Sequence, residues 1–234
     1  MRDLENIQGS RIYGRRQGKP LTPSRQKLVD ELLPRLVVDA ADSDTAVEIN
    51  DLFAADIEDL WFEVGFGKGE HLAWQAAHHP NTGFIGCEPF LNGIAGLLGH
   101  VEAQSLENVR IFTDDARLLM DRLPDASIGR FFVLFPDPWP KARHHKRRFI
   151  NPGNLDVIAR LLKDGAELRV GTDHMDYCRW TLMQLMRRDD FEWIAAGPDD
   201  WRQRPADWPP SRYEAKALTQ GRKSAYLRFR RKAR

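Results

Sequence analysis

The chain has 234 residues, of which 42% are hydrophobic, and a formal net charge of only +1. A chain of this size can bury a full core, and one large domain is expected rather than two. No apolar run approaches membrane-spanning length and the first sixteen residues, MRDLENIQGSRIYGRR, are too polar for a signal peptide, so we expect a soluble, cytosolic protein. Cys87 and Cys178 are expected as reduced thiols, with a single disulfide as the alternative.

The small net charge conceals an uneven distribution along the chain. From residue 37 to 60 there are eight acidic residues and no Lys or Arg, whereas the last thirteen residues, RKSAYLRFRRKAR, are strongly basic. The N-terminal region and the segment around residue 145 are basic as well. Basic segments far apart in sequence can form one face for phosphate groups, which favours a nucleic-acid partner. The alternative for each segment is a solvated surface or a frayed tail.

The first part of the chain is expected to be an appendage to the main fold. Up to about residue 20 it is expected to be a flexible arm rich in Arg and Gly. Thr22-Pro23-Ser24 then predicts the start of a helix that ends near Leu36, because Pro is tolerated in a first helical turn. The acidic stretch that follows is expected to be a surface connection, with a short helix around residues 47–55.

From Leu60 onwards, short apolar runs typical of buried strands alternate with longer segments typical of helices. Strands are expected at residues 60–64, 84–87, 109–112, 131–135, 167–170, 191–194 and 225–229. Helices are expected at residues 70–78, 90–103, 116–122, 154–162 and 177–186. This order predicts an α/β fold with an open, doubly wound, mostly parallel seven-stranded sheet, helices on both faces and an antiparallel edge strand.

In sheets of this kind a ligand lies beyond the carboxyl ends of the strands, where the strand order reverses. The first strand ends in Glu63, and Gly65 and Gly67 follow it, permitting a tight turn and close approach of a ligand to the backbone. The second strand ends in Glu88, where a carboxylate can accept hydrogen bonds from both hydroxyls of a ribose. Asp115 follows the third strand and is either part of the same site or the N-cap of the next helix.

The acids at the three strand ends distinguish between adenosine cofactors. A dinucleotide carries a pyrophosphate, which Glu63 would repel so close to the glycines. S-adenosylmethionine carries an ammonium and a sulfonium and no phosphate, so the same acids attract it. The pattern therefore favours S-adenosylmethionine, although the glycines alone would also fit a plain tight turn.

The most distinctive stretch is FFVLFPDPWPKARHHKRR, residues 131–148. Its apolar start predicts a buried strand that Pro136 ends, and three prolines then restrict the turn that holds Asp137 and Trp139. A basic run follows directly. Its members, which we expect to contact phosphate, are Lys141, Arg143, Lys146, Arg147 and Arg148. The combination predicts chemistry on part of a polyanion, with Trp139 either stacked on an exposed base or part of the core.

A long segment, residues 195–224, separates the last two predicted strands and is expected to be a loop. A loop of this length in a compact domain is usually functional or disordered. Within it, Arg212 offers a guanidinium for phosphate, and Glu214 offers a carboxylate that can accept from the N1–H and amino group of guanine. The alternative is a loop that its tryptophans pin to the sheet.

Several segments together resemble the bacterial tRNA (guanine-N7-)-methyltransferase family. They are GFGKGE at 65–70, IGCEP at 85–89, DDA at 114–116, FPDPWPKARHHKRR at 135–148, TD at 172–173 and SRYE at 211–214. The resemblance runs from Leu60 to the C-terminus in the family's order and spacing, and the FPDPW segment with its basic run is the specific part. The family usually has Thr in place of Ser211 and often Phe in place of Tyr213, and here a hydroxyl and a ring are kept.

The resemblance implies a Rossmann-like class I methyltransferase domain over residues 57–234, preceded by residues 1–56 as a basic arm, a helix and an acidic connection. It implies methyl transfer from S-adenosylmethionine to N7 of a guanine in the tRNA variable loop, usually position 46. Separately, no metal is expected, because His144, His145 and His174 lack the spacing and partners of a metal site, and no membrane is expected, because no apolar run is long enough. Asp137 is the implied catalytic residue. The implied cofactor set is Glu63, Glu88, Asp115 and Asp137, beside Gly65 and Gly67. The implied tRNA or guanine contacts are Lys141, Asp173, Ser211, Arg212, Tyr213 and Glu214.

Two other hypotheses stay open from the sequence. Asp137-Pro138-Trp139 loosely resembles the turn of enzymes that methylate exocyclic amino groups, although the second proline of that turn is missing. A non-catalytic RNA-binding module that kept the fold is the other, and the retained acids and glycines argue against it. The oligomeric state is open between a monomer and a homodimer.

Overall fold

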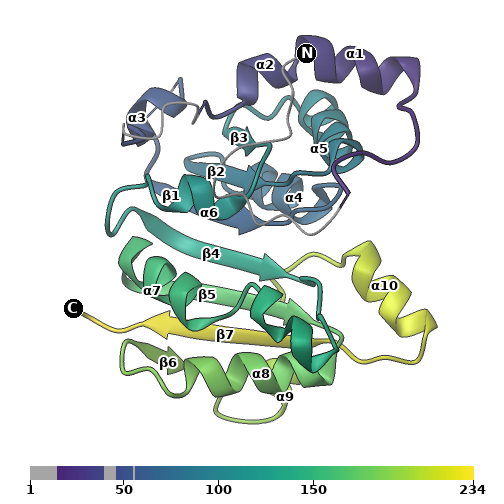
Figure 1. Ribbon diagram of the computed structural model, residues 1–234. Helices are drawn as coiled ribbons and strands as arrows, with labels where there is room; N and C mark the ends of the chain where they lie inside the picture. The colour runs from purple at the N-terminus through teal and green to yellow at the C-terminus, as the bar shows by residue number, and fades with distance from the viewer. Residues whose placement is uncertain (1–14, 40–45, 55) are drawn as a thin grey trace.

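The computed structural model describes residues 15–39, 46–54 and 56–234, so most of the expected flexible arm lies outside the described residues. The apolar runs form a seven-stranded sheet between two layers of helices (Figure 1). The strands are β1 (Asp59–Val64), β2 (Thr82–Cys87), β3 (Val109–Phe112), β4 (Ile128–Leu134), β5 (Leu162–Thr172), β6 (Phe191–Trp193) and β7 (Ala225–Arg231). The predicted doubly wound α/β fold is confirmed.

The strand order is β3-β2-β1-β4-β5-β7-β6, and β1 to β5 pair in parallel. β7 is antiparallel to both of its neighbours and lies between β5 and the edge strand β6. The last two strands therefore pair as antiparallel neighbours, as predicted. Because the chain leaves β1 in one direction for β2 and β3 and returns to the other side of β1 for β4, the strand order reverses between β1 and β4.

The helices that cover the sheet follow from the amphipathic segments. They are α1 (Pro23–Glu31), α2 (Leu33–Leu36), α3 (Ile49–Leu52), α4 (Glu70–His78), α5 (Leu91–Gln104), α6 (Ala116–Met120), α7 (Pro152–Leu161), α8 (Met175–Leu185), α9 (Asp199–Arg202), α10 (Arg212–Thr219) and the 3-10 helix η1 (Ala142–Arg147). The helix predicted at 22–36 is divided at Leu32, because Pro34 lacks the N–H that a continuous helix needs. In the described part of the chain, no helix is long and apolar enough to cross a membrane.

The prediction of a loop throughout residues 195–224 is wrong, because α9 and α10 lie within it. The Ser211 side chain accepts from the backbone N–H of Glu214, and the Glu214 side chain accepts from the backbone N–H of Ser211. This reciprocal capping box starts α10. Ser followed three residues later by Glu is a helix start signal that the sequence carries.

Core side chains alternate between the two faces of the sheet, as the twofold period of a strand requires. On one face Phe62 of β1 stacks on Phe131 of β4, with ring centroids 5.0 Å apart. On the other face their neighbours Trp61 and Phe132 pack together, with centroids 5.9 Å apart. One aromatic pair therefore packs on each face of the sheet at the β1–β4 contact, where the strand order reverses.

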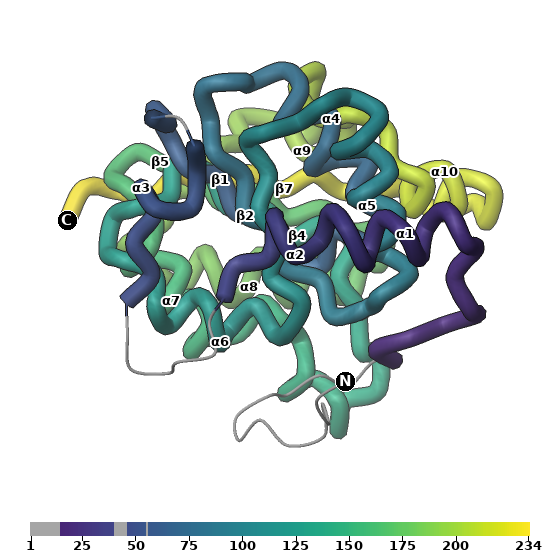
Figure 2. Tube along the Cα trace, turned by 90° about the horizontal axis from the view of Figure 1, so that it is seen from above, coloured from purple at the N-terminus to yellow at the C-terminus, as the bar shows by residue number. Residues whose placement is uncertain are grey.

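The N-terminal region packs on the same sheet. α1 lies along α5, as the view from above shows (Figure 2). The backbone N–H of Val38 donates to the carbonyl of Ile111 in β3 at 2.8 Å, and Val38, Val47 and Phe53 are buried in the core. The expectation of a surface connection is therefore incomplete. In the described part of the acidic stretch, apolar residues pack into the core and cover part of the sheet. The domain boundary at residue 57 stays a prediction.

The stacked pair at the centre of the sheet gives a test of stability. Phe131→Ala is expected to lower the free energy of unfolding by about 3–5 kcal/mol, because it leaves a cavity beside Phe62. Leu218→Ala is the matched control, since Leu218 is 62% exposed, and it is expected to change stability by less than about 0.5 kcal/mol. Urea unfolding followed by circular dichroism measures both, and equal effects would contradict this account of the core.

Candidate active site

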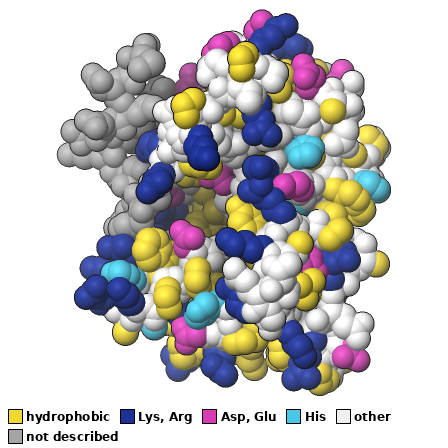
Figure 3. Space-filling model, turned by 90° about the vertical axis from the view of Figure 1, so that its right-hand side faces the viewer, with side chains coloured by type: hydrophobic (Ala, Val, Ile, Leu, Met, Phe, Trp, Pro, Cys, Tyr) yellow, Lys and Arg dark blue, Asp and Glu magenta, His cyan; other side chains and the backbone are white. Residues whose placement is uncertain are grey.

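A cavity of about 430 Å³ lies at the carboxyl ends of β1 to β4, where the strand order reverses. It opens on the side of the molecule shown in Figure 3, where Lys and Arg side chains surround the hollow. The ends of four strands contribute to its lining. The predicted site residues among the lining are Gly65, Gly67, Glu88, Asp115, Asp137, Arg147, Arg212 and Tyr213. The structure therefore brings together residues that are up to 148 positions apart in the sequence.

The glycine turn, residues 65–69, shapes one wall of the cavity. Gly65 and Gly67 have φ angles of 68° and 61°, in the left-handed region that favours glycine. A Cβ atom at Gly65 would meet no atom within 4 Å, so this position faces open space and leaves its backbone accessible. The N–H of Gly65 donates to the carbonyl of Cys87 at 2.7 Å, which holds the turn against the end of β2.

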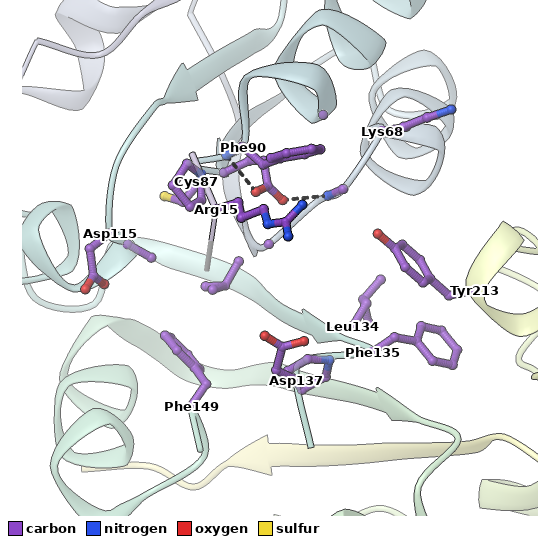
Figure 4. Close-up of a pocket in the computed structure, with 18 of the residues that line it drawn as sticks. Arg15, Lys68, Cys87, Phe90, Asp115, Leu134, Phe135, Asp137, Phe149 and Tyr213 are labelled. Atoms are coloured by element: carbon purple, nitrogen blue, oxygen red, sulfur yellow. Dashed lines mark hydrogen bonds between the residues drawn. The ribbon is translucent and has the colours of Figure 1, made fainter. Parts of the chain in front are cut away.

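Glu88 lines the cavity, and two backbone groups hold its carboxylate. Its Oε2 accepts from the N–H of Gly67 and its Oε1 from the N–H of Phe90, both at 3.0 Å (Figure 4). Burial raises the pKa of Glu88, the negative charges of Asp137 and Glu63 act in the same direction, and the two backbone hydrogen bonds act against them. The carboxylate is thus oriented by the backbone and keeps lone pairs for a ligand.

Glu63 lies behind the glycine turn and is not among the cavity lining. It is 4% exposed, and its Oε2 lies 2.7 Å from Nδ1 of His71. The amide nitrogen of Gln75 lies 3.2 Å from Nε2 of His71 and donates to the carbonyl of Asp207 at 2.7 Å. Since the amide donates to Nε2, the neutral His71 carries its proton on Nδ1 and donates it to Glu63. Nothing in the sequence distinguishes His71 from other helical residues, so this contact could not be predicted.

Asp115 is the N-cap of a helix and also part of the cavity lining. Its side chain accepts from the N–H of Arg117 at 3.1 Å, which makes it the N-cap of α6. It also forms an ion pair with the guanidinium of Arg117. At the same time it lines the cavity, at the edge opposite Tyr213 (Figure 4). The N-cap is confirmed, and the cofactor contact stays a prediction.

Asp137 lies in a strained turn, residues 135–139. Phe135 and Trp139 have φ angles of 50° and 42°, which residues other than Gly, Asn and Asp rarely adopt. The Asp137 carboxylate between them points into the cavity (Figure 4). Trp139 lines the cavity beside it, with the guanidinium of Arg147 4.9 Å from its ring. The core alternative for Trp139 is therefore wrong, and stacking on a base stays a prediction.

The basic run divides into exposed and buried members. Lys141, Arg143 and Lys146 are exposed on or beside η1, and Arg147 is half-buried at the cavity. Arg148 is 1% exposed, so its guanidinium is not at the surface where a phosphate could reach it. The placement of Arg148 does not match the predicted RNA contact, because aromatic side chains of α8 cover it.

The segment 211–214 is divided in a similar way. Arg212 and Tyr213 line the cavity, and the Tyr213 ring lies against Gly67. Ser211 and Glu214 form the capping box, and Oε1 of Glu214 also accepts from the Tyr226 hydroxyl. The structure therefore brings the middle two residues to the cavity and uses the outer two to hold the helix.

Two further predicted contacts lie outside the cavity lining. Lys141 is exposed, and Asp173 forms an ion pair with Arg222 at 3.0 Å. The end of the C-terminal basic segment lies farther away, at the amino ends of the parallel strands, because β7 runs opposite to β5 (Figure 1). Arg234, for example, pairs with Asp164 there. The expectation of one basic face is therefore wrong for the end of this segment.

Part of the basic arm reaches the cavity. Arg15 is among its lining, and Arg16 forms an ion pair with Asp114 at 3.0 Å. The carbonyl of Arg16 accepts from the N–H of Leu91 at 2.9 Å, and the N–H of Gly18 donates to Asn92 at 2.8 Å. The expected flexibility does not apply to these residues. Sequence reasoning missed them as site residues, since their partners are about 75 or more positions away.

The segment before α10 is tied to the sheet by a buried arginine. Arg169 of β5 is 1% exposed and pairs with Glu167 and Asp207, each at 2.8 Å. Burial raises the pKa of Asp207, but the hydrogen bond and charge of Arg169 outweigh it and lower the pKa overall. Since Asp207 also accepts from Gln75 through its carbonyl, it joins the glycine-turn side of the site to the segment that carries Tyr213.

The strand order, the glycine turn and the cavity at the strand ends together define the class I methyltransferase fold. Solved structures support this fold. An antibiotic related methyltransferase aligns with a TM-score of 0.54 at 19% identity, over 82% of this chain and 98% of that one. The 16S rRNA methyltransferase KamB aligns with a TM-score of 0.54 at 15% identity, over 76% of this chain and 90% of that one. At this level of identity the likeness concerns the fold alone.

Sequence comparisons lead from the class to the family. The family model described as "Putative methyltransferase" matches residues 58–227. The tRNA (guanine-N(7)-)-methyltransferase of Rhodospirillum rubrum is 51% identical over 227 residues, which cover 96% of this chain and 89% of that protein. The enzyme of the same name from Zymomonas mobilis is 51% identical over 221 residues, 94% of each chain. This chain belongs to the tRNA (guanine-N(7)-)-methyltransferase family, as its motifs indicated.

The Asp207 anchor predicts a defined dependence of stability on pH. Asp207→Asn is expected to lower the free energy of unfolding near neutral pH by about 1 kcal/mol, the size found for partly exposed ion pairs. The folded-state pKa is lowered, so the wild-type advantage is present above the unfolded pKa of about 4 and is lost as the pH falls through the folded pKa. Urea unfolding at a series of pH values measures the difference. A difference that persists undiminished in acid would rule out this ion pair as its origin.

Proposed function

We propose that this protein transfers the methyl group of S-adenosylmethionine to N7 of a guanine in tRNA, forming 7-methylguanosine. The proposed target is the variable loop, usually position 46. The observation that carries the proposal is the Asp137 carboxylate pointing into the cavity at the strand ends, directly beside an exposed basic run. Membership of a family whose curated members carry this activity in their names supports the same assignment.

The cavity suits S-adenosylmethionine better than a phosphate-bearing cofactor. Four carboxylates line it, of which Asp114 and Asp115 pair with arginines, so Glu88 and Asp137 are the two proposed to attract a cationic ligand. We propose that Glu88 binds the ribose hydroxyls, because backbone N–H groups already orient its two oxygens. Gly65 leaves room for a ligand against the backbone. When bound, S-adenosylmethionine supplies an electrophilic methyl group.

The residues at the cavity can promote methylation of a ring nitrogen without a general base. N7 of guanine has a free lone pair in the plane of the ring, so no proton must leave before it attacks. Catalysis can then rest on positioning and electrostatics. We propose that Asp137 stabilises the positive charge that develops on the purine as N7 gains the methyl group. The rigid turn keeps its carboxylate in place, so little reorganisation is needed during the reaction.

Binding of tRNA is proposed to use the surface around the cavity. Lys141, Arg143 and Lys146 are exposed there and can bind phosphates. Tyr213 and Trp139 both line the cavity and offer rings on which a flipped guanine can stack. The Glu214 carboxylate accepts from the Tyr226 hydroxyl, and a guanine contact is proposed to use its remaining lone pairs. A tRNA substrate also implies action in the cytoplasm.

The decisive experiment for the function is incubation of the purified protein with unmodified tRNA transcript and methyl-labelled S-adenosylmethionine, followed by nucleoside analysis. Label in 7-methylguanosine of the variable loop is the expected result. Label on an exocyclic amine would contradict the proposal and would identify the protein as an amino-group methyltransferase instead. Tight tRNA binding with no label would favour the non-catalytic RNA-binding module.

The role of Asp137 predicts a selective loss of turnover. Asp137→Asn keeps the size of the side chain but removes its charge, so kcat is expected to fall by about 100-fold or more. The melting temperature is expected to change little, because the Asp137 side chain is exposed, while the Kd for S-adenosylmethionine is expected to rise by less than kcat falls, because Glu88 still lines the cavity. Steady-state kinetics with tRNA transcript measure the effect. Wild-type turnover by the variant would refute a catalytic role.

The exposed members of the basic run predict steeply salt-dependent tRNA binding. Arg143→Ala and Lys146→Ala are each expected to reduce the slope of log K against log salt concentration by about one. Lys232→Ala is the matched control, because Lys232 is exposed after β7 at the opposite edge of the sheet. Filter binding over a range of salt concentrations gives the slopes. The same reduction in all three variants would mean that the basic run is ordinary surface.

A further inference from the structure

The catalytic turn has little means of holding its own shape. Pro136 and Pro138 lie in the turn and Pro140 directly follows it. None of the three has an N–H, so none can donate a backbone hydrogen bond. The turn also contains the strained residues Phe135 and Trp139. A strained backbone of this kind persists only when the surrounding structure holds it. The groups that hold residues 135–139 therefore decide where the Asp137 carboxylate lies.

One end of the turn is held by the sheet. The N–H of Phe135 donates to the carbonyl of Gly171 in β5 at 2.7 Å. The other end is held by Arg148, whose Nε donates to the carbonyl oxygen of Pro138 at 3.0 Å. Pro138 directly follows Asp137, so this hydrogen bond acts one residue from the carboxylate. A displacement of about 1 Å at such a position is enough to cost about 100-fold in rate.

Arg148 is itself locked in place from three sides. Its Nη2 lies 2.5 Å from Oδ2 of Asp176, at the start of α8. The centre of the guanidinium lies 5.0 Å from the ring centroid of Trp180 and 5.6 Å from that of Tyr177. Both rings also contact Ile150, since Trp180 donates to its carbonyl and the Tyr177 hydroxyl accepts from its N–H. The guanidinium is thus part of a rigid junction between the basic run and α8.

Arg148 is distinguished from the rest of the basic run by this environment. It is 1% exposed, whereas Arg143 and Lys146 are exposed to solvent. A planar guanidinium can bond to a carbonyl and a carboxylate at once while stacking on a ring, and an ammonium cannot. We infer that Arg148 is a positioning residue for Asp137 rather than a phosphate contact. This inference rests on the proposed methyl transfer to tRNA.

Kinetics and salt dependence together test the inference. Arg148→Gln removes the charge. Arg148→Lys keeps the charge but removes the planar guanidinium with its several N–H donors. Both are expected to lower kcat by about 10- to 100-fold, with the salt slope of tRNA binding equal to that of wild type. Arg143→Ala shows what loss of a phosphate contact does to the slope, a reduction of about one. Lys232→Ala, exposed after β7, is the matched control and is expected to leave both kcat and the slope unchanged. Rates are normalised to the fraction of protein that binds S-adenosylmethionine, so a loss of folding alone does not lower kcat.

Asp176→Asn extends the test to the partner of Arg148. The Asp176 side chain is 52% exposed, so an amide is tolerated there, but it no longer attracts the guanidinium. A loss of kcat of about 3- to 10-fold at an unchanged salt slope is expected. In the double variant with Arg148→Lys, the loss of kcat is expected to be no greater than in Arg148→Lys alone. Both changes weaken the same interaction between Arg148 and Asp176, so their effects do not add.

Three outcomes would overturn the inference. The first is a salt slope reduced by about one in Arg148→Gln, which marks a phosphate contact. The second is wild-type kcat in folded Arg148→Lys. If neither Arg148 variant folds, wild-type kcat in Asp176→Asn overturns it instead, and a reduced kcat supports it. The wild-type protein is assayed in parallel: absence of 7-methylguanosine from that reaction counts against the proposed function, whereas normal wild-type product with unimpaired variants counts against the role of Arg148.

Discussion

Parallel pairing of β1 with β4 is the constraint on which the site depends. It places Glu63 beside Phe132 and Val64 beside Val133, so the two strands end at the same edge of the sheet. The glycine turn continues from one strand and the Asp137 turn from the other. Because the chain leaves in opposite directions from this point, helices do not cover the gap between the two turns. The cavity is a consequence of topology before any side chain contributes to it.

The electrostatics of the site follow from the two turns. Four carboxylates follow the strand ends into the cavity and share its lining with five Lys and Arg side chains, while the run after Asp137 makes the neighbouring surface positive. A small cation and a polyanion can therefore bind side by side with little mutual competition. The net charge of +1 hides this separation, because acids and bases nearly cancel over the whole chain.

Rigidity at the site comes from buried polar groups rather than from the turns themselves. Arg148 holds the end of the Asp137 turn, and Arg169 holds Asp207 and with it the segment that leads to Tyr213. Each guanidinium is 1% exposed and meets a carboxylate. Buried charges of this kind are costly unless they are paired, so they fix one arrangement of the loops against the sheet.

The sequence by itself determined the strand and helix order, the cofactor class, and the local motif around Asp137. These depend on hydrophobic period, on glycine and proline, and on the chemistry of residues close in sequence. The capping box of Ser211 and Glu214 belongs with them, since its signal is local. Only the tertiary structure decided which side chains face the cavity. Glu63 turns to His71, and Arg148 turns inward to α8, because their partners lie 8 and 28 positions along the chain on other elements.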